Sequence, residues 1–125
     1  MKRIILDTNF LTIPYQFNVD IFEEIDRIME EKYELVTLDK VVEELKELTK
    51  SRSKDAVAAK LGLELIKNKN IKIINTEDKN VDNVIVSISD KNTIVATNDR
   101  MLRRKLKNKN VKVLYLRSKR RLEMG

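Results

Sequence analysis

Short apolar runs alternate with longer segments of helical periodicity along the whole chain. The apolar runs predict strands at residues 2–6, 34–37, 71–74, 93–96 and 111–116. Between them, apolar residues recur every three or four positions, which predicts helices from Asn18 or Asp20 to about 32, from Asp39, from Ser53 or Asp55, from Asn80, and at 98–107. Residues 10–17, which contain the only proline, are expected to form a loop with at most one helical turn. This alternation favours an α/β fold with helices on both faces of a central parallel sheet of about five strands.

The length of the chain fits a single domain with a substantial core. Its 125 residues contain no long linker and no internal repeat, so we expect one domain over 1–125, with a basic tail at about 117–125. No apolar stretch approaches the ~20 residues of a membrane span. The first residues enter a strand rather than a signal peptide. The sequence therefore predicts a cytoplasmic protein.

The chain contains neither cysteine nor histidine. This excludes disulfides, thiol nucleophiles, zinc sites built from Cys and His, and catalysis that uses a histidine as acid or base. Hydrolytic chemistry would have to rely on carboxylates, hydroxyls, lysines or metal ions. Oxygen ligands alone favour Mg²⁺ or Mn²⁺ over softer ions.

Positive charge is concentrated near the C-terminus. The net charge is +6, from 26 Lys and Arg against 20 Asp and Glu, and residues 100–112 carry seven cations and no acid. Such a run next to a catalytic site would bind phosphates with little sequence preference. The residues predicted to bind a polyanion such as RNA are Arg100, Arg103, Arg104, Lys107, Arg117, Lys119, Arg120 and Arg121.

Two of the predicted strands end on an aspartate. Asp7 follows the run 4–6 directly, and Asp99 comes three residues after the run 93–96. If both strands are central and parallel, the two carboxylates meet at the carboxyl edge of the sheet, where open α/β folds place their sites. Asp99 also suits a helix start, whereas no helix is expected directly behind Asp7. Like charges held together repel unless a cation joins them.

Helical geometry selects two further acids. On the helix that begins near Asp39, Glu44 lies about 90° from the centre of the apolar stripe, whereas Glu43 and Glu47 lie near the solvent side. Asp82 flanks the apolar stripe in the first turn of its helix in the same way. Both helices follow strands, so their first turns lie at the same end of a parallel sheet.

Together Asp7, Glu44, Asp82 and Asp99 make an oxygen-ligand set for one or two Mg²⁺ or Mn²⁺ ions. Such a set can hold a metal-activated water and stabilise charge on a phosphodiester during hydrolysis. This would allow a protein without histidine to cleave a nucleic acid.

The segments that carry these acids resemble the PIN-domain nucleases. They are residues 4–9 (IILDTN), 41–45 (VVEEL), 81–85 (VDNVI) and 94–99 (IVATND), in that order. The resemblance implies a three-layer α/β/α fold and a metal-dependent endoribonuclease that acts on single-stranded RNA. It matches the four acids to the family's four metal-binding positions, and Asn9 and Thr97 to the polar positions that support them. Asn83 stands where close relatives often carry another acid.

Two biological roles are consistent with this resemblance. Residues 94–106 and 113–116 look especially like the PIN proteins that process small-subunit ribosomal RNA precursors. PIN toxins of bacterial and archaeal toxin–antitoxin pairs share the same fold and acids. The partners implied are single-stranded RNA or an rRNA precursor, an antitoxin in the second case, and a second copy of the chain in a homodimer.

Two rival interpretations compete with a nuclease. A phosphoacceptor module of receiver type also gathers acids at a sheet edge, but it needs a pair of acids after the first strand, where Asp7 stands alone. An inactive RNA-binding scaffold would keep the fold and the basic tail without metal affinity. The presence of all four acids favours the nuclease.

Overall fold

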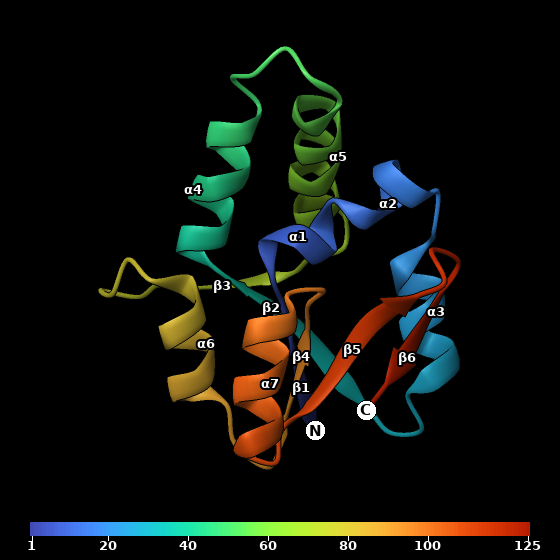
Figure 1. Cartoon of the computed structure of the whole chain (residues 1–125), viewed down its shortest axis with the longest axis vertical. Coiled ribbons are helices and arrows are strands. Elements are labelled where there is room, and N and C mark those ends of the chain that lie inside the picture. Colours follow the sequence, from blue (N-terminus) through green and yellow to red (C-terminus); the bar gives the residue numbers. More distant parts are fainter.

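The computed structural model describes all residues, 1–125, and its sheet explains how distant acids can meet (Figure 1). Six strands pair in the order β3-β2-β1-β4-β5-β6. The strands are β1 (Lys2–Leu6), β2 (Tyr33–Leu38), β3 (Lys72–Ile74), β4 (Thr93–Ala96), β5 (Lys112–Arg117) and β6 (Arg121–Met124). Strands β1 to β5 are parallel, and β6 runs antiparallel to β5.

Seven helices cover the sheet. They are α1 (Thr8–Leu11), α2 (Ile13–Phe17), α3 (Ile21–Ile28), α4 (Asp39–Leu48), α5 (Lys54–Asn68), α6 (Val81–Ile88) and α7 (Arg100–Asn108). Right-handed crossovers place α1 to α5 on one face and α6 and α7 on the other. Contacts between α4 and α5, and between α6 and α7, agree with this division, and Figure 1 shows the α4–α5 pair extending past the carboxyl edge of the sheet. The predicted three-layer α/β/α architecture is confirmed.

The centre of the sheet is formed by β1 and β4, which pair directly with each other. Ile4, Ile5 and Leu6 are fully buried, and β4 is buried along its whole length. Burial on both faces explains why these strands are continuous apolar runs rather than alternating ones. The backbone N–H of Asp7 donates to Ala96 O at 3.0 Å, so the ends of β1 and β4 lie side by side.

Residues 10–17, predicted as a loop with at most one helical turn, are mostly helical. Asp7 caps α1, α2 follows immediately, and Pro14 is accommodated in the first turn of α2, where a missing N–H costs no helical hydrogen bond. The expectation that no helix begins behind Asp7 was wrong. Helix boundaries elsewhere differ by small amounts; α3 ends at Ile28 rather than near residue 32.

The basic tail predicted at 117–125 contains a sixth strand. Ser118 and Lys119 both have positive φ, at 55° and 58°, and Arg120 N donates to Arg117 O at 3.2 Å. This is a tight hairpin with both central residues left-handed, a turn that usually selects Asn-Gly. Because Ser-Lys carries no such signal, no local pattern indicated that β6 should be added to the five predicted strands.

The outer edge of β6 is tied to α3. Leu122 N donates to Glu24 Oε1 at 2.9 Å, and Arg27 Nη2 donates to Leu122 O at 3.1 Å. Glu24 and Arg27 also pair with each other at 3.0 Å, and this hydrogen bond with Arg27 is the main reason that the pKa of Glu24 is lowered. The two outward-facing backbone groups of Leu122 are thus satisfied by one ion pair.

Candidate active site

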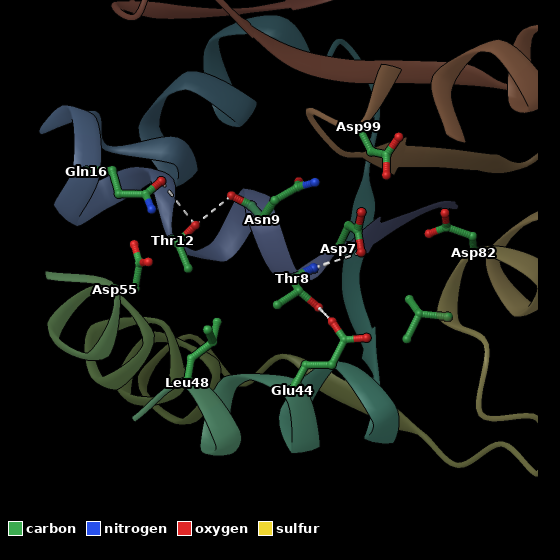
Figure 2. Close-up of a pocket in the computed structure, with 11 residues that line it drawn as sticks. Asp7, Thr8, Asn9, Thr12, Gln16, Glu44, Leu48, Asp55, Asp82 and Asp99 are labelled. Carbon is green, nitrogen blue, oxygen red and sulfur yellow. Dashed lines mark hydrogen bonds between the residues drawn. The ribbon is translucent and has the colours of Figure 1, made fainter. Parts of the chain in front are cut away.

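The four predicted acids line one cavity of about 380 Å³ at the carboxyl edge of the sheet (Figure 2). Asp7 follows β1, and Asp99 precedes α7 after β4. Glu44 comes from α4 and Asp82 from the first turn of α6. The helices on the two faces of the sheet therefore each contribute an acid, and the two central strands contribute the other two.

Asp7 is the buried member of the set, with 5% of its surface exposed. Thr97 Oγ1 donates to its Oδ2 at 2.7 Å, and Thr8 N donates to its Oδ1 at 2.8 Å. Burial raises the pKa of Asp7 from 3.8 to about 6, more strongly than these two hydrogen bonds lower it, and the charges of Asp82 and Glu44 raise it further. Asp7 therefore gains from any bound cation that keeps its carboxylate ionised.

Glu44 is held in the cavity by the residue that follows Asp7. Thr8 Oγ1 donates to Glu44 Oε2 at 2.6 Å (Figure 2). The neighbouring acids on α4 lie outside: Glu43 faces Lys40 at 3.8 Å, and Glu47 pairs with Lys50 at 3.0 Å, both with exposed side chains. The structure thus separates Glu44 from its neighbours as the helical geometry predicts.

Asp99 has two roles. Its Oδ1 accepts hydrogen bonds from Met101 N at 2.8 Å and Leu102 N at 3.1 Å, so it caps α7. It also lines the cavity together with Asp82. The pKa of Asp82 is raised, first because the side chain is partly buried and second because of the negative charge of Asp99. Asp82 and Asp99 are therefore electrostatically coupled.

Asn9 and Thr97, predicted to support the acids, connect the ends of the two central strands. Asn9 Oδ1 accepts from Asn98 N at 3.0 Å. Thr97 Oγ1 accepts from Asp99 N at 3.1 Å while it donates to Asp7. Through one buried hydroxyl, the positions of Asp7 and Asp99 are linked.

The acids surround a space rather than touching one another. No group of three or more of them is arranged so that it could hold a metal ion directly. Mg²⁺ commonly keeps several of its waters and takes only one or two carboxylates from the protein. A cavity whose charged groups are all carboxylates fits such a hydrated ion, because the pKa of its buried Asp7 is raised chiefly by burial and further by the charges of Asp82 and Glu44.

Sequence reasoning missed four further polar residues of this cavity: Thr8, Thr12, Gln16 and Asp55. Thr8 stands between Asp7 and Asn9 in the predicted motif, and its position there was a usable signal. Thr12 and Gln16 lay in the segment predicted as a loop, so they had no expected direction. Asp55 looked like an ordinary acid at a helix start.

The predicted RNA-binding cations fall into two groups. Arg103 lies on the ring of Tyr115, with its Cζ 3.4 Å from the ring centroid, and Arg117 and Arg121 pair with Glu123 at 3.1 and 3.7 Å. The other five are exposed and have no carboxylate within 4.0 Å: Arg100, Arg104, Lys107, Lys119 and Arg120. Three of these five lie on α7, the helix that Asp99 caps.

Comparison with known sequences identifies the family of this fold. Residues 4–119 match the family described as "PIN like domain". The chain is 36% identical to the protein named Ribonuclease VapC4 of Methanocaldococcus jannaschii, over 99% of this chain and 97% of that one. It is 29% identical to Ribonuclease VapC9 of Archaeoglobus fulgidus, over 98% and 88% of the two chains.

Solved structures share the architecture. The PIN domain endonuclease Utp24 superposes with a TM-score of 0.77 at 23% identity, covering 98% of this chain and 90% of that one. VapBC-1 from nontypeable Haemophilus influenzae gives a TM-score of 0.51 at 12% identity, covering 85% and 93%. None of the helices has the length and apolar character needed to cross a membrane.

Proposed function

Since the chain belongs to the PIN-domain ribonuclease family, we propose that it is an endoribonuclease that requires Mg²⁺ or Mn²⁺. The observation that carries the proposal is the cavity in which Asp7, Glu44, Asp82 and Asp99 converge from four separate elements. Four carboxylates that line one cavity, with Asp7 among them buried, are a poor arrangement for stability alone. They are a good arrangement for binding a hard divalent cation.

The four acids would hold a hydrated ion or ions, partly through the waters that the cation keeps, and the surrounding hydroxyls would fix the directions of the acids. A bound divalent cation would supply activation of a water and neutralisation of charge on the phosphodiester. Thr97 keeps one oxygen of Asp7 turned toward β4, and Thr8 keeps Glu44 turned toward Asp7. Asp99 lines the cavity while its Oδ1 caps α7.

RNA would approach along α7. Arg100, Arg104 and Lys107 are exposed on the helix whose first residue follows Asp99. Arg103 has its guanidinium on the face of Tyr115, so we assign it to shaping the surface rather than to binding phosphate. Arg103 is therefore removed from the predicted RNA-binding residues, and Arg100, Arg104 and Lys107 on α7 are kept.

For the biological role we favour a toxin ribonuclease controlled by an antitoxin. The supporting observation is the 36% identity, over nearly the whole of both chains, to a protein named VapC4. The alternative, ribosomal RNA processing, rests on the resemblance of residues 94–106 and 113–116 to PIN proteins that process ribosomal RNA precursors, because the likeness to Utp24, at 23% identity, carries the fold alone. Copurification with a small protein encoded next to this gene would decide for the toxin, and copurification with pre-ribosomal particles would decide against it.

Glu44 and Glu43 provide a matched test of the active site. Glu44→Gln is expected to lower the rate of RNA cleavage in Mg²⁺ or Mn²⁺ by about 100-fold, because even indirect supports of a metal site cost about 10–100-fold. Glu43→Gln, one residue away on the same helix and solvent-facing, is expected to leave the rate within about twofold of the wild type, because its charge is already solvated. The measurement is cleavage of labelled single-stranded and structured RNA. Equal rates for the two variants would place the active site elsewhere.

The salt dependence of RNA binding tests the proposed path along α7. Arg104→Gln combined with Lys107→Gln is expected to weaken binding and to reduce the slope of log K against log salt by about 0.7 for each lost phosphate contact with single-stranded RNA. A control pair, Lys67→Gln with Lys72→Gln, removes exposed charge near the opposite edge of the sheet and should not change the slope. Equal slopes for the two pairs would place the RNA on another face.

A further inference from the structure

The acid cavity continues into a second one on the side away from Asp82. Gln16 and Asp55 line the 380 Å³ cavity and also a neighbouring cavity of about 730 Å³, which Tyr15 and Lys54 line as well. Figure 2 shows Gln16 and Asp55 together at the end of the site opposite Asp82. We call the surface formed by Tyr15, Gln16, Lys54 and Asp55 the Asp55 groove. It lies between α2 and the first turn of α5.

The side chains of the Asp55 groove have unused binding capacity. The Asp55 carboxylate accepts no hydrogen bond from the protein and has no cation within 4.0 Å, whereas the Asp55 backbone N–H donates to Ser53 Oγ. Gln16 Oε1 accepts from Thr12 Oγ1 at 3.3 Å, which leaves the amide NH₂ without a partner. The side chain of Tyr15 is partly uncovered, at 44% exposure, and its hydroxyl makes no hydrogen bond.

These groups suit a nucleobase rather than a phosphate. A carboxylate repels the RNA backbone but accepts hydrogen bonds from the amino and imino groups of a base edge. An exposed tyrosine ring stacks on a base of any kind. Lys54, which has no ion pair, is placed to contact the phosphate attached to that base. The groove therefore offers one acceptor, one amide donor, one aromatic face and one cation.

We propose that the Asp55 groove binds an unpaired base next to the cleaved phosphodiester and selects guanine. This rests on the ribonuclease function proposed above. Guanine presents two neighbouring donors, N1–H and N2–H, to the Asp55 carboxylate, and its O6 accepts from the Gln16 amide. Uracil has a single donor between two carbonyl oxygens, so one of these would face the carboxylate. Adenine and cytosine can each accept from the Gln16 amide at a ring nitrogen, but each offers only its amino group to the carboxylate, so neither makes the two-donor contact that guanine makes.

Cleavage of a random-sequence single-stranded RNA pool tests this selection. We expect wild-type fragment ends to be enriched in guanine at one position close to the cut. Asp55→Ala should lower that enrichment by about fivefold or more, in line with a lost bidentate contact. Tyr15→Ala should also lower it, whereas Tyr15→Phe, which keeps the ring, should restore it. Glu64→Ala, an exposed acid further along α5, is the matched control and should leave the enrichment unchanged.

Binding measurements keep the test independent of catalysis. Fluorescence anisotropy with the Asp7→Asn variant and labelled hexanucleotides should show tighter binding of a guanine-containing RNA than of oligouridine, and Asp55→Ala in that background should remove the difference. If no wild-type preparation cuts RNA, the proposed ribonuclease function fails, and the binding result still decides on the groove. If the wild type shows no guanine preference, or if Asp55→Ala preserves the preference, the groove proposal is overturned and the ribonuclease stands.

Discussion

Asp7→Asn is expected to abolish RNA cleavage and, in the same protein, to increase stability. The activity should fall by more than about 100-fold, because Asp7 is the acid at the centre of the set, and even outer supports of a metal site cost about 10–100-fold. Asparagine keeps the size of the side chain and can still accept the hydrogen bond from Thr8 N or from Thr97 Oγ1. The loss would therefore reflect charge rather than shape.

The increase in stability follows from the raised pKa of Asp7. In the folded protein the pKa is about 6, against 3.8 for the ordinary group, chiefly because of burial. Between these values the folded state binds more protons than the unfolded chain, so the free energy of unfolding falls as pH rises through this window. Above pH 6 the resulting loss in the free energy of unfolding of the wild type is at most about 3 kcal/mol. The side-chain amide of the variant does not titrate, so this loss should be absent.

Thermal unfolding in EDTA at pH 5 and at pH 7 measures this effect. The wild type should lose stability between the two pH values relative to Asp7→Asn, and the variant should be the more stable protein at pH 7. Asp78→Asn is the control, because Asp78 is exposed outside the cavity and its hydrogen bond from Asn80 N can be accepted by an amide. A variant that loses both activity and stability would show that Asp7 supports the fold, contrary to the electrostatic argument.

Removal of divalent cations is expected to reduce cleavage to the background rate. The chain has no histidine or cysteine to act in their place, and the polar groups of the cavity are carboxylates, hydroxyls and amides. Addition of Mg²⁺ or Mn²⁺ after EDTA treatment should restore activity. It should also raise the melting temperature, because a ligand that binds only the folded state stabilises it by mass action.

The pH dependence and a variant make this prediction specific to the acid cavity. Protons compete with the cation for Asp7, so the melting-temperature increase caused by Mg²⁺ should shrink as the pH falls below about 6. Asp99→Asn should reduce that increase at every pH and lower cleavage by orders of magnitude, since it removes one of the two strand-end acids. Cleavage that persists in EDTA, or an equal melting-temperature increase in wild type and Asp99→Asn, would contradict the metal requirement.

The central part of the fold and the meeting of the four acids could be predicted because both depend on local patterns. Strands β1 and β4 are buried on both faces, which leaves an unbroken apolar run in each. Parallel pairing then brings the residues after Leu6 and Ala96 to the same edge without further information. Glu44 could be separated from Glu43 because the helical repeat of about 3.6 residues fixes which side of α4 each one occupies.

The parts that were missed depend on contacts that leave no local pattern. The hairpin before β6 uses Ser118 and Lys119 at positive φ, which neither residue type favours. Helices α1 and α2 are only four and five residues long, too short for periodicity, and they are held by packing against α4 and α5. Because α1 and α2 could not be predicted, neither the hydrogen bond from Thr8 to Glu44 nor the direction of the Gln16 side chain could be predicted either.

The ion pair that closes β6 affects how this protein behaves at high concentration. An uncovered final strand would be a template for strand addition by another molecule, the first step toward fibrils. Glu24 and Arg27 occupy the backbone groups of Leu122 that such an addition would need. The opposite edge strand is β3, which has only three residues and therefore offers few backbone groups for pairing with a strand of another chain. A basic protein that would gather on polyanionic RNA thus has both rims of its sheet protected against growth into an aggregate.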